Sequence, residues 1–255
     1  MGAGTPLVEH VCSYLGRLAH AHCVSVQSMA RDLAVRVRPV LGSSQWRRAF
    51  CAVDARSLNG LTMYSSLVVP LLQELTGNAA LKEGCWLFAQ DQLAKTSISL
   101  LVSRRRWCPL CYQDDLRRHG YCFDRLIWQV APLTRCVVHE IPLADVCHKC
   151  GSAQDAVSRP EDRLRCTCGA ALTELVGGNA GPPSIEAIAW QDWCFRQIVL
   201  LFENREEIAS TPPCAVRDFM NELRDLTHSN WAKIDSWLEF KPYHARLVAA
   251  GAARA

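Results

Sequence analysis

Trp107-Cys108-Pro109-Leu110-Cys111 is the first of four short motifs that each carry two side chains able to bind a metal ion. The other three motifs are Cys136-Val-Val-His139, Cys147-His-Lys-Cys150 and Cys166-Thr-Cys168. Zinc takes four soft or borderline ligands in a tetrahedron, and two ligands close together on a tight turn can reach one ion. Because two such motifs complete a site, the eight side chains predict two zinc ions.

The motifs can be paired in two ways. In sequential pairing the first two motifs share one ion and the last two share the other, whereas in the interleaved pairing of RING-type modules alternate motifs share an ion. The seven residues between His139 and Cys147 are long for the interleaved pattern, which favours sequential pairing. Since protein ligands would fill both sites, while a catalytic zinc keeps a position open for water, we expect both ions to be structural. The sites are then Cys108, Cys111, Cys136 and His139, and Cys147, Cys150, Cys166 and Cys168.

The composition is that of a globular chain. Of its 255 residues 49% are apolar and 21% charged, which excludes a disordered or fibrous protein. The apolar runs are far shorter than the roughly 20 residues that cross a bilayer, and the first residues do not resemble a signal peptide. We therefore expect a soluble, cytoplasmic protein with no membrane contact, in which clustered cysteines are metal ligands rather than disulfides.

Recognised catalytic patterns are missing from the sequence. It has no Gly-rich phosphate loop, no Gly-x-Ser-x-Gly elbow and no His-Glu-x-x-His motif. A zinc deaminase needs His-x-Glu and Pro-Cys-x-x-Cys, but here Glu140 follows His139 directly and Pro109 lies inside the first pair. Adjacent acidic residues such as Asp114-Asp115 are expected on a solvated face. The sequence thus predicts a protein that is not an enzyme.

Local charge is more informative than net charge. The formal value is +3, and two zinc ions bound by seven thiolates would bring it to about zero. Around the first zinc motif, however, basic residues outnumber acidic ones and lie beside Trp107 and Tyr121. Arginine beside aromatic rings suits phosphate contact and stacking with nucleic acid, although a solvated face or an acidic protein partner fits equally well. The candidate nucleic-acid contacts are Arg104, Arg105, Arg106, Arg117 and Arg118.

Apolar periodicity predicts helices on both sides of the zinc motifs. A first helix from Leu7 to about Ala21 is followed by a break and by Ser25, a good N-cap for a short helix from Val26 to about Val35. This spacing is that of a helix–turn–helix pair. We expect a loop at 39–44, a helix at 45–53, and a helix at 61–75 that stops at Gly77.

The C-terminal part is also predicted to be helical. Residues 177–183 form a linker, after which Ser184 can cap a helix that runs to about Glu203, with two more helices beyond Thr211. The predicted fold is mainly α with a small zinc-stabilised α+β middle region. Its three domains are a helix–turn–helix domain (1–95), a tandem zinc-binding domain (96–176) and a helical domain (184–255).

The zinc motifs, together with three shorter stretches, resemble the TniQ family of transposition proteins over roughly residues 5–175. These stretches are the opening run from Glu9 to Ala19, Ser57-Leu-Asn-Gly60 and Leu75-Thr76-Gly77. The resemblance implies an N-terminal helix–turn–helix domain, a zinc-finger domain whose ligands are the eight residues above, and no catalytic activity. It also implies a role in target-site selection, a place on the bacterial nucleoid, and an AAA+ transposition ATPase as partner. Some family members bind target DNA, some associate with RNA-guided targeting complexes, and some form homodimers.

The first hypothesis is therefore a non-catalytic adaptor that links target DNA or a targeting complex to the AAA+ ATPase that recruits the transposase. Two alternatives stay open. One is a stand-alone zinc-containing DNA-binding transcription regulator that makes base contacts through the second N-terminal helix. The other is a RING-like protein-interaction module, which requires interleaved zinc pairing.

Overall fold

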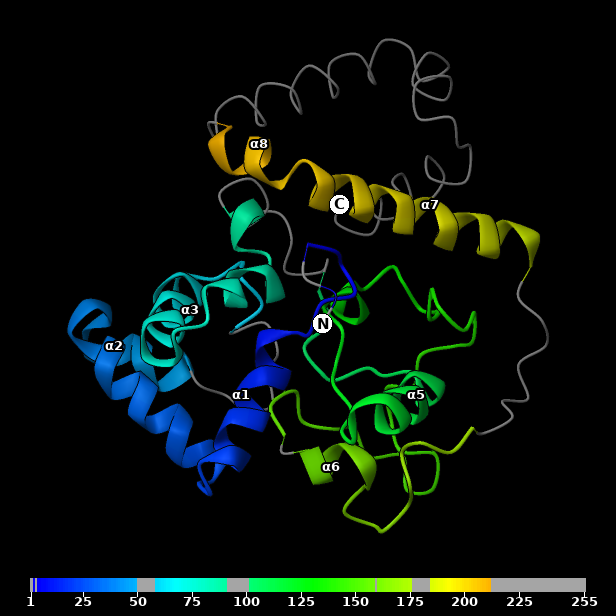
Figure 1. The fold of residues 1–255 in the computed structure, drawn as a ribbon, viewed down its shortest axis with the longest axis horizontal. Helices are drawn as coiled ribbons and strands as arrows, with labels where there is room; N and C mark the ends of the chain where they lie inside the picture. Colours follow the sequence, from blue (N-terminus) through cyan, green and yellow to red (C-terminus); the bar gives the residue numbers. More distant parts are fainter. Residues whose placement is uncertain are drawn as a thin grey trace, which may run out of the picture.

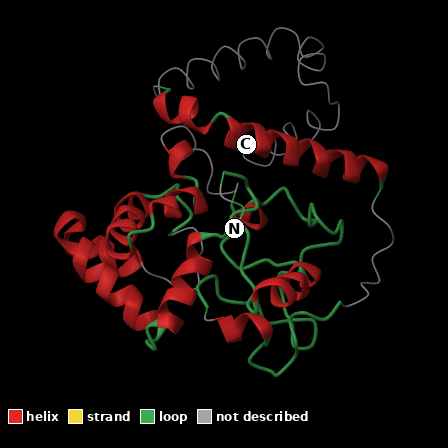
Figure 2. Cartoon of the chain, viewed as in Figure 1, coloured by secondary structure: helices red, strands yellow, loops and turns green. Residues whose placement is uncertain are grey.

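The computed structural model describes residues 2, 4–49, 58–90, 101–158, 160–175 and 184–211. Its described part is mainly helical (Figure 2). Helices α1, α2 and α3 gather on one side of the molecule, the loops of the zinc motifs lie on the other, and α7 and α8 run along one edge (Figure 1). No described helix is both long enough and apolar enough to span a bilayer.

Helix α1 (Val11–Ala21) buries one apolar face and begins at His10, whose Nδ1 accepts a hydrogen bond from the Cys12 amide at 3.1 Å. A four-residue turn follows, in which Cys23 adopts a positive φ of 55°. The side chain of Ser25 then accepts a hydrogen bond from the amide of Ser28, at the start of α2, as expected for an N-cap. The predicted turn and cap between the first two helices are thereby confirmed, but the first helix begins at Val11 and not at Leu7 as predicted, because the backbone before it is fixed by other contacts, such as that of the Val8 carbonyl with the Leu126 amide.

Helix α2 (Val26–Ala49) is much longer than the sequence predicted. The expected end near Val35, the loop at 39–44 and the start of a new helix at 45 are wrong, because one helix continues through all of them. Pro39 suggested the break, but a proline inside a helix removes one backbone hydrogen bond and is accommodated when neighbouring turns hold. The last four residues of the predicted 45–53 helix lie outside the described residues.

Helix α3 (Met63–Thr76) agrees with its prediction. Thr62 and Ser65 form a reciprocal capping box at its start, and Gly77 ends it in the left-handed conformation with a φ of 66°. The 3-10 helices η2 (Ala79–Gly84) and η3 (Leu87–Ala89) follow. Buried side chains of α1, α2 and α3 form one apolar cluster, which we call the helical core.

The middle region contains α5 (Pro109–His119), the 3-10 helix η4 (Leu126–Gln129) and the short α6 (Pro160–Leu164). The predicted α+β character is only partly present: β structure among the described residues is limited to isolated bridges. Three of these bridges, such as Val146 with Ala153, close turns next to metal-ligand motifs. Turns this short align too few residues to extend into strands.

Helix α7 (Ile185–Glu203) begins at Ser184, whose side chain accepts from the Ala187 amide as predicted, and α8 (Arg205–Ser210) follows it. The buried face of α7 belongs to a second apolar cluster, the metal-side core, which also contains Trp107 and five of the eight candidate metal ligands. The predicted linker at 177–183 and the predicted helices beyond Thr211 lie outside the described residues.

The two cores exchange residues across the predicted domain boundaries. Val8 and Trp86, from the first predicted domain, pack in the metal-side core. Ala156 and Val157, from the second, pack in the helical core. The three-domain division stays a prediction. Among the described residues, each of the first two predicted domains contributes side chains to the apolar core of the other.

Candidate metal centres

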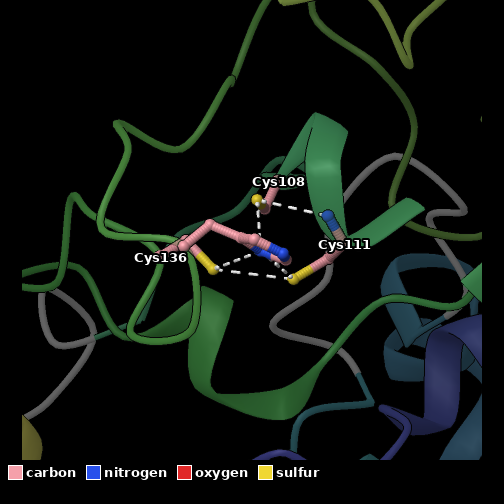
Figure 3. A group of neighbouring side chains, drawn as sticks. Cys108, Cys111 and Cys136 are labelled. Atoms are coloured by element: carbon pink, nitrogen blue, oxygen red, sulfur yellow. Dashed lines mark hydrogen bonds between the residues drawn. The ribbon is translucent and has the colours of Figure 1, made fainter. Parts of the chain in front are cut away.

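The first candidate centre is built on the start of α5. Cys108 is the N-cap residue of this helix, Pro109 occupies its first turn, and the Cys111 amide donates a hydrogen bond to Cys108 Sγ at 3.4 Å. A helix N-terminus favours negative charge, so this position stabilises a thiolate. Cys136 faces the pair from a separate loop (Figure 3), with its Sγ 3.6 Å from Cys111 Sγ.

His139 completes this centre through Nδ1, which lies 3.6, 3.2 and 3.8 Å from the sulfur atoms of Cys108, Cys111 and Cys136 respectively. Its other ring nitrogen, Nε2, lies 3.0 Å from Oδ2 of Asp114 on α5. A carboxylate that accepts from the outer nitrogen of a metal-binding histidine fixes its tautomer and ring orientation. Asp114 was expected on a solvated face, and its contact with His139 was not predictable because it depends on the first turns of α5, a helix that the sequence did not predict.

The turn from Cys136 to His139 is closed by a hydrogen bond from the Glu140 amide to the Cys136 carbonyl at 2.8 Å. Glu140 has a positive φ of 55°, and the guanidinium of Arg135 donates to its carbonyl. The second centre has glycine at the equivalent positions, Gly151 with a φ of 70° and Gly169 with a φ of 87°. All three motifs therefore turn through a left-handed residue just after the second ligand, and only Glu140 adopts this conformation with a side chain attached.

The second candidate centre is held by two such turns. Its Sγ atoms lie 3.7 Å apart for Cys147 and Cys168, and 3.6 Å apart for Cys150 and Cys166. The side-chain amide of Gln154 donates a hydrogen bond to Cys166 Sγ at 3.4 Å. Unlike the three buried cysteines of the first centre, two of these four, Cys150 and Cys168, are exposed.

Both groups fit tetrahedral zinc. With Zn–S near 2.3 Å and Zn–N near 2.05 Å, a tetrahedron separates two sulfur atoms by about 3.8 Å and sulfur from nitrogen by about 3.6 Å. The observed separations are within a few tenths of an ångström of these values, and in each group all four ligand atoms lie within 4.8 Å of one another. The grouping is the sequential one that the sequence favoured. Each set of four could hold a metal ion with no position left open.

The prediction for Asp115 is wrong. It was expected on a solvated face, but it is 3% exposed and its carboxylate accepts two hydrogen bonds from Arg125, at 3.1 and 2.8 Å. Burial raises the pKa of this carboxyl above its usual value, while the arginine opposes the shift. Asp114 and Asp115 thus support the first centre and its surroundings from adjacent positions on α5.

The five candidate nucleic-acid residues have different environments. Arg105 is 4% exposed and donates to the Ser158 hydroxyl at 3.0 Å. Arg106 donates to three carbonyl oxygens, those of Trp128, Val130 and Leu133, and burial lowers its pKa to about 10. Both guanidinium groups therefore hold protein segments together. Exposed side chains remain at Arg104, Arg117 and Arg118.

Comparison with known families gives one finding. A sequence model of the TniQ family matches residues 2–143, which include α1, α2, α3 and the first candidate centre. The second candidate centre begins at Cys147, just beyond the match. A search of curated proteins found no match to the chain.

Proposed function

Because the chain belongs to the TniQ family, whose members are non-catalytic transposition proteins, we propose that it acts in target-site selection as an adaptor. It links target DNA, or a complex already bound to the target, to the AAA+ ATPase that recruits the transposase. The observation that carries this proposal is the family match over more than half of the chain.

The two candidate centres support a structural rather than a chemical role. We propose that Cys108, Cys111, Cys136 and His139 bind one zinc ion and that Cys147, Cys150, Cys166 and Cys168 bind a second. Bound there, zinc crosslinks loops that have little regular structure, and a structural zinc site can supply up to about 10 kcal/mol to folding. Four protein ligands leave no place for a reacting water, which favours an adaptor over a hydrolase.

A nucleic-acid surface is proposed for the exposed end of α5. Arg117 and Arg118 lie in the last turn of this helix, and Arg104 is exposed on the segment that leads into it. Two residues after the end of α5, the ring centroid of Tyr121 lies 4.8 Å from the guanidinium carbon of Arg17. Cations beside an aromatic ring suit contact with phosphates and bases. Arg105 and Arg106 are left out of this surface because their guanidinium groups face inward.

This surface has a direct test. Replacing Arg104, Arg117 and Arg118 by glutamine should weaken binding to duplex DNA and flatten its salt dependence, since each lost phosphate contact removes about 0.9 from the slope. Arg196→Gln, which removes an exposed cation from α7, is the matched control. An unchanged salt slope in the triple variant would remove this surface from the proposal.

The alternative functions make different demands. A RING-like module needs interleaved ligand pairing, whereas the grouping here is sequential. A stand-alone transcription regulator needs sequence-specific DNA binding without an ATPase, with α2 as the helix that reads bases. The regulator is therefore the alternative that the decisive experiment must separate from the adaptor.

That experiment is co-purification of the zinc-loaded chain with the AAA+ ATPase of its own element, with and without duplex DNA. Retention supports the adaptor, and its DNA dependence tells whether this chain or the ATPase holds the target. Absence of association under both conditions, in a sample with two zinc ions per chain, would favour the stand-alone regulator.

A further inference from the structure

The chain between the two ligand motifs of the second centre leaves that centre, reaches α1 and returns. Residues 151–165, which we call the strap, leave the centre after Cys150 and return to it at Cys166. Between these ends the strap includes α6, which lies beside α1 in Figure 1. The strap is described except for residue 159.

The strap is packed against α1 without space to spare. Ala156 and Val157 are buried in the helical core together with side chains of α1. At Gly16 of α1, an added Cβ would lie 1.9 Å from the Ser158 carbonyl oxygen, far inside contact distance. The glycine is therefore needed for the strap backbone to approach this closely.

Polar contacts fix the same joint. Arg163 of α6 is fully buried, and its guanidinium donates to the carbonyl of Ser13 in α1 at 2.9 Å. Its Nε lies 3.3 Å from a carboxylate oxygen of Asp124, a residue that also accepts from Tyr112 of α5. A buried arginine is stabilised only while such partners stay in place. The guanidinium of Arg163 on the strap therefore depends on partners that it meets only when the strap is docked.

The two ends of the strap depend on the second centre. The motif before the strap supplies Cys147 and Cys150, and the motif after it supplies Cys166 and Cys168. An ion bound by all four would fix the ends of the strap together and remove the entropy cost of closing this loop in each docking event. Since Cys150 and Cys168 are exposed, this centre is also open to solvent and to chelators.

We propose that the second centre and the strap form a metal-dependent clasp, in which zinc binding holds the strap against α1 and zinc loss releases it. The clasp joins the helical core to the metal-side core. Released, it takes Ala156, Val157 and Arg163 out of the interior and uncovers the face of α1 around Gly16. The state of the second centre thereby controls how firmly the two halves of the molecule are joined.

Thermodynamic linkage makes the clasp reciprocal. If zinc favours the docked strap by some factor, then a change that undocks the strap must weaken zinc binding by that same factor. A centre that is merely adjacent to the strap would show neither effect. The proposal can therefore be tested from the metal side and from the α1 side independently.

The metal-side test uses trypsin on the full-length variants Cys150→Ser and Cys168→Ser. Arg163 is buried and Arg165 is exposed, so cleavage in the wild type should occur after Arg165 and not after Arg163. In both variants we expect cleavage after Arg163 to rise at least tenfold relative to cleavage after Arg165. Cys23→Ser, which alters an exposed cysteine outside both centres, is the matched control. One zinc ion retained per chain confirms that each variant keeps the first centre.

The α1-side test uses Gly16→Ala, which changes no metal ligand. Chelator competition should find one of the two zinc ions held about tenfold more weakly and the other unchanged. If this variant does not fold, Arg163→Met, which removes the hydrogen bond to Ser13, replaces it. Arg163 protected in the cysteine variants, or both zinc affinities unchanged in the α1-side variant, would overturn the clasp. Neither result bears on the association with the ATPase, so the adaptor proposal stands or fails separately.

Discussion

The two candidate metal centres have similar ligands in very different surroundings. The first has three buried cysteines, of which Cys108 caps the N-terminus of α5, and a histidine whose outer nitrogen contacts the Asp114 carboxylate. The second has four cysteines on two short turns, two of them exposed. All three cysteines of the first centre lie in the metal-side core, whereas only Cys147 and Cys166 of the second centre do, and that centre closes the base of the strap. We infer that the first centre is required for folding and that the second mainly holds the strap in place, so loss of the first ion should cost more stability than loss of the second.

The largest effect is expected from Cys136→Ser in the first centre. Loss of its ion would remove on the order of 10 kcal/mol, which is comparable to the whole stability of a typical domain. The variant should be mostly insoluble and lack a cooperative thermal transition. Zinc content and circular dichroism melting measure this, with Cys122→Ser as control because Cys122 is buried outside both centres. A soluble Cys136→Ser protein with the wild-type melting temperature would remove the proposed difference between the centres.

A smaller loss is expected from Cys168→Ser in the second centre. A crosslink that closes a loop of about 15 residues contributes about 3 kcal/mol, so the protein should remain folded with one zinc ion and a lower melting temperature. Urea unfolding of the two variants side by side gives the comparison directly. Equal destabilisation by Cys136→Ser and Cys168→Ser would show that the two centres have the same role.

Acid should affect the two candidate centres and also His10. The contribution of His10 to the pH dependence of stability must therefore be measured separately. Burial lowers the pKa of His10 from 6.5 to about 3, so the imidazole is neutral when folded and takes up a proton on unfolding below pH 6.5. Its contribution to stability is full above pH 6.5 and is lost as the pH falls toward 3. Each pH unit below 6.5 removes about 1.4 kcal/mol from the free energy of unfolding, so the loss at pH 5 is about 2 kcal/mol.

The variant His10→Asn, which keeps a capping side chain, should therefore lose about 2 kcal/mol less than the wild type between pH 7.5 and pH 5. Both proteins carry the same candidate metal ligands, so any release of zinc would affect both urea unfolding curves equally and cancel in their difference. Parallel pH profiles would contradict the assignment to His10.

The smallest effect is expected from Asp114→Asn. A neutral amide supports the His139 imidazole less well than a carboxylate, and loss of such support typically weakens a metal site 10- to 100-fold. We expect about tenfold weaker zinc binding at the first centre by chelator competition. Glu174→Gln is the control, because Glu174 lies 3.3 Å from His148, next to a ligand of the second centre, and is itself exposed. Equal effects of the two changes would show that Asp114 has no special role.

Features that depend on neighbours in the chain were predictable. The cap at Ser184 and the stop at Gly77 follow from residue types at fixed spacings, and the structure confirms both. The eight candidate ligands follow in the same way, and the structure brings them together in two groups of four that could each hold a metal ion. The continuation of α2 through Pro39 was not predictable from local propensity. A proline weakens a helix, and packing elsewhere on the helix decides whether it continues.

The environments of the arginines were also beyond the sequence. Arg104, Arg105 and Arg106 are consecutive and chemically identical, yet only the first has an exposed side chain. Their environments are set by carbonyl and hydroxyl groups at least 22 residues away in the chain, such as Trp128 and Ser158. A basic run therefore indicates charge but does not tell which of its members face solvent.

The interleaving of the two cores limits how this protein can be divided or recombined. The indole nitrogen of Trp107 donates to the Leu172 carbonyl at 2.9 Å, and the buried face of α7 completes the core around the first centre. A chain cut at residue 143, where the family match ends, would leave that core without its cover and α1 without the strap. A chimera of two relatives should therefore take α1 and the strap from the same parent. Its crossover points should lie in segments that contribute no side chain to either core.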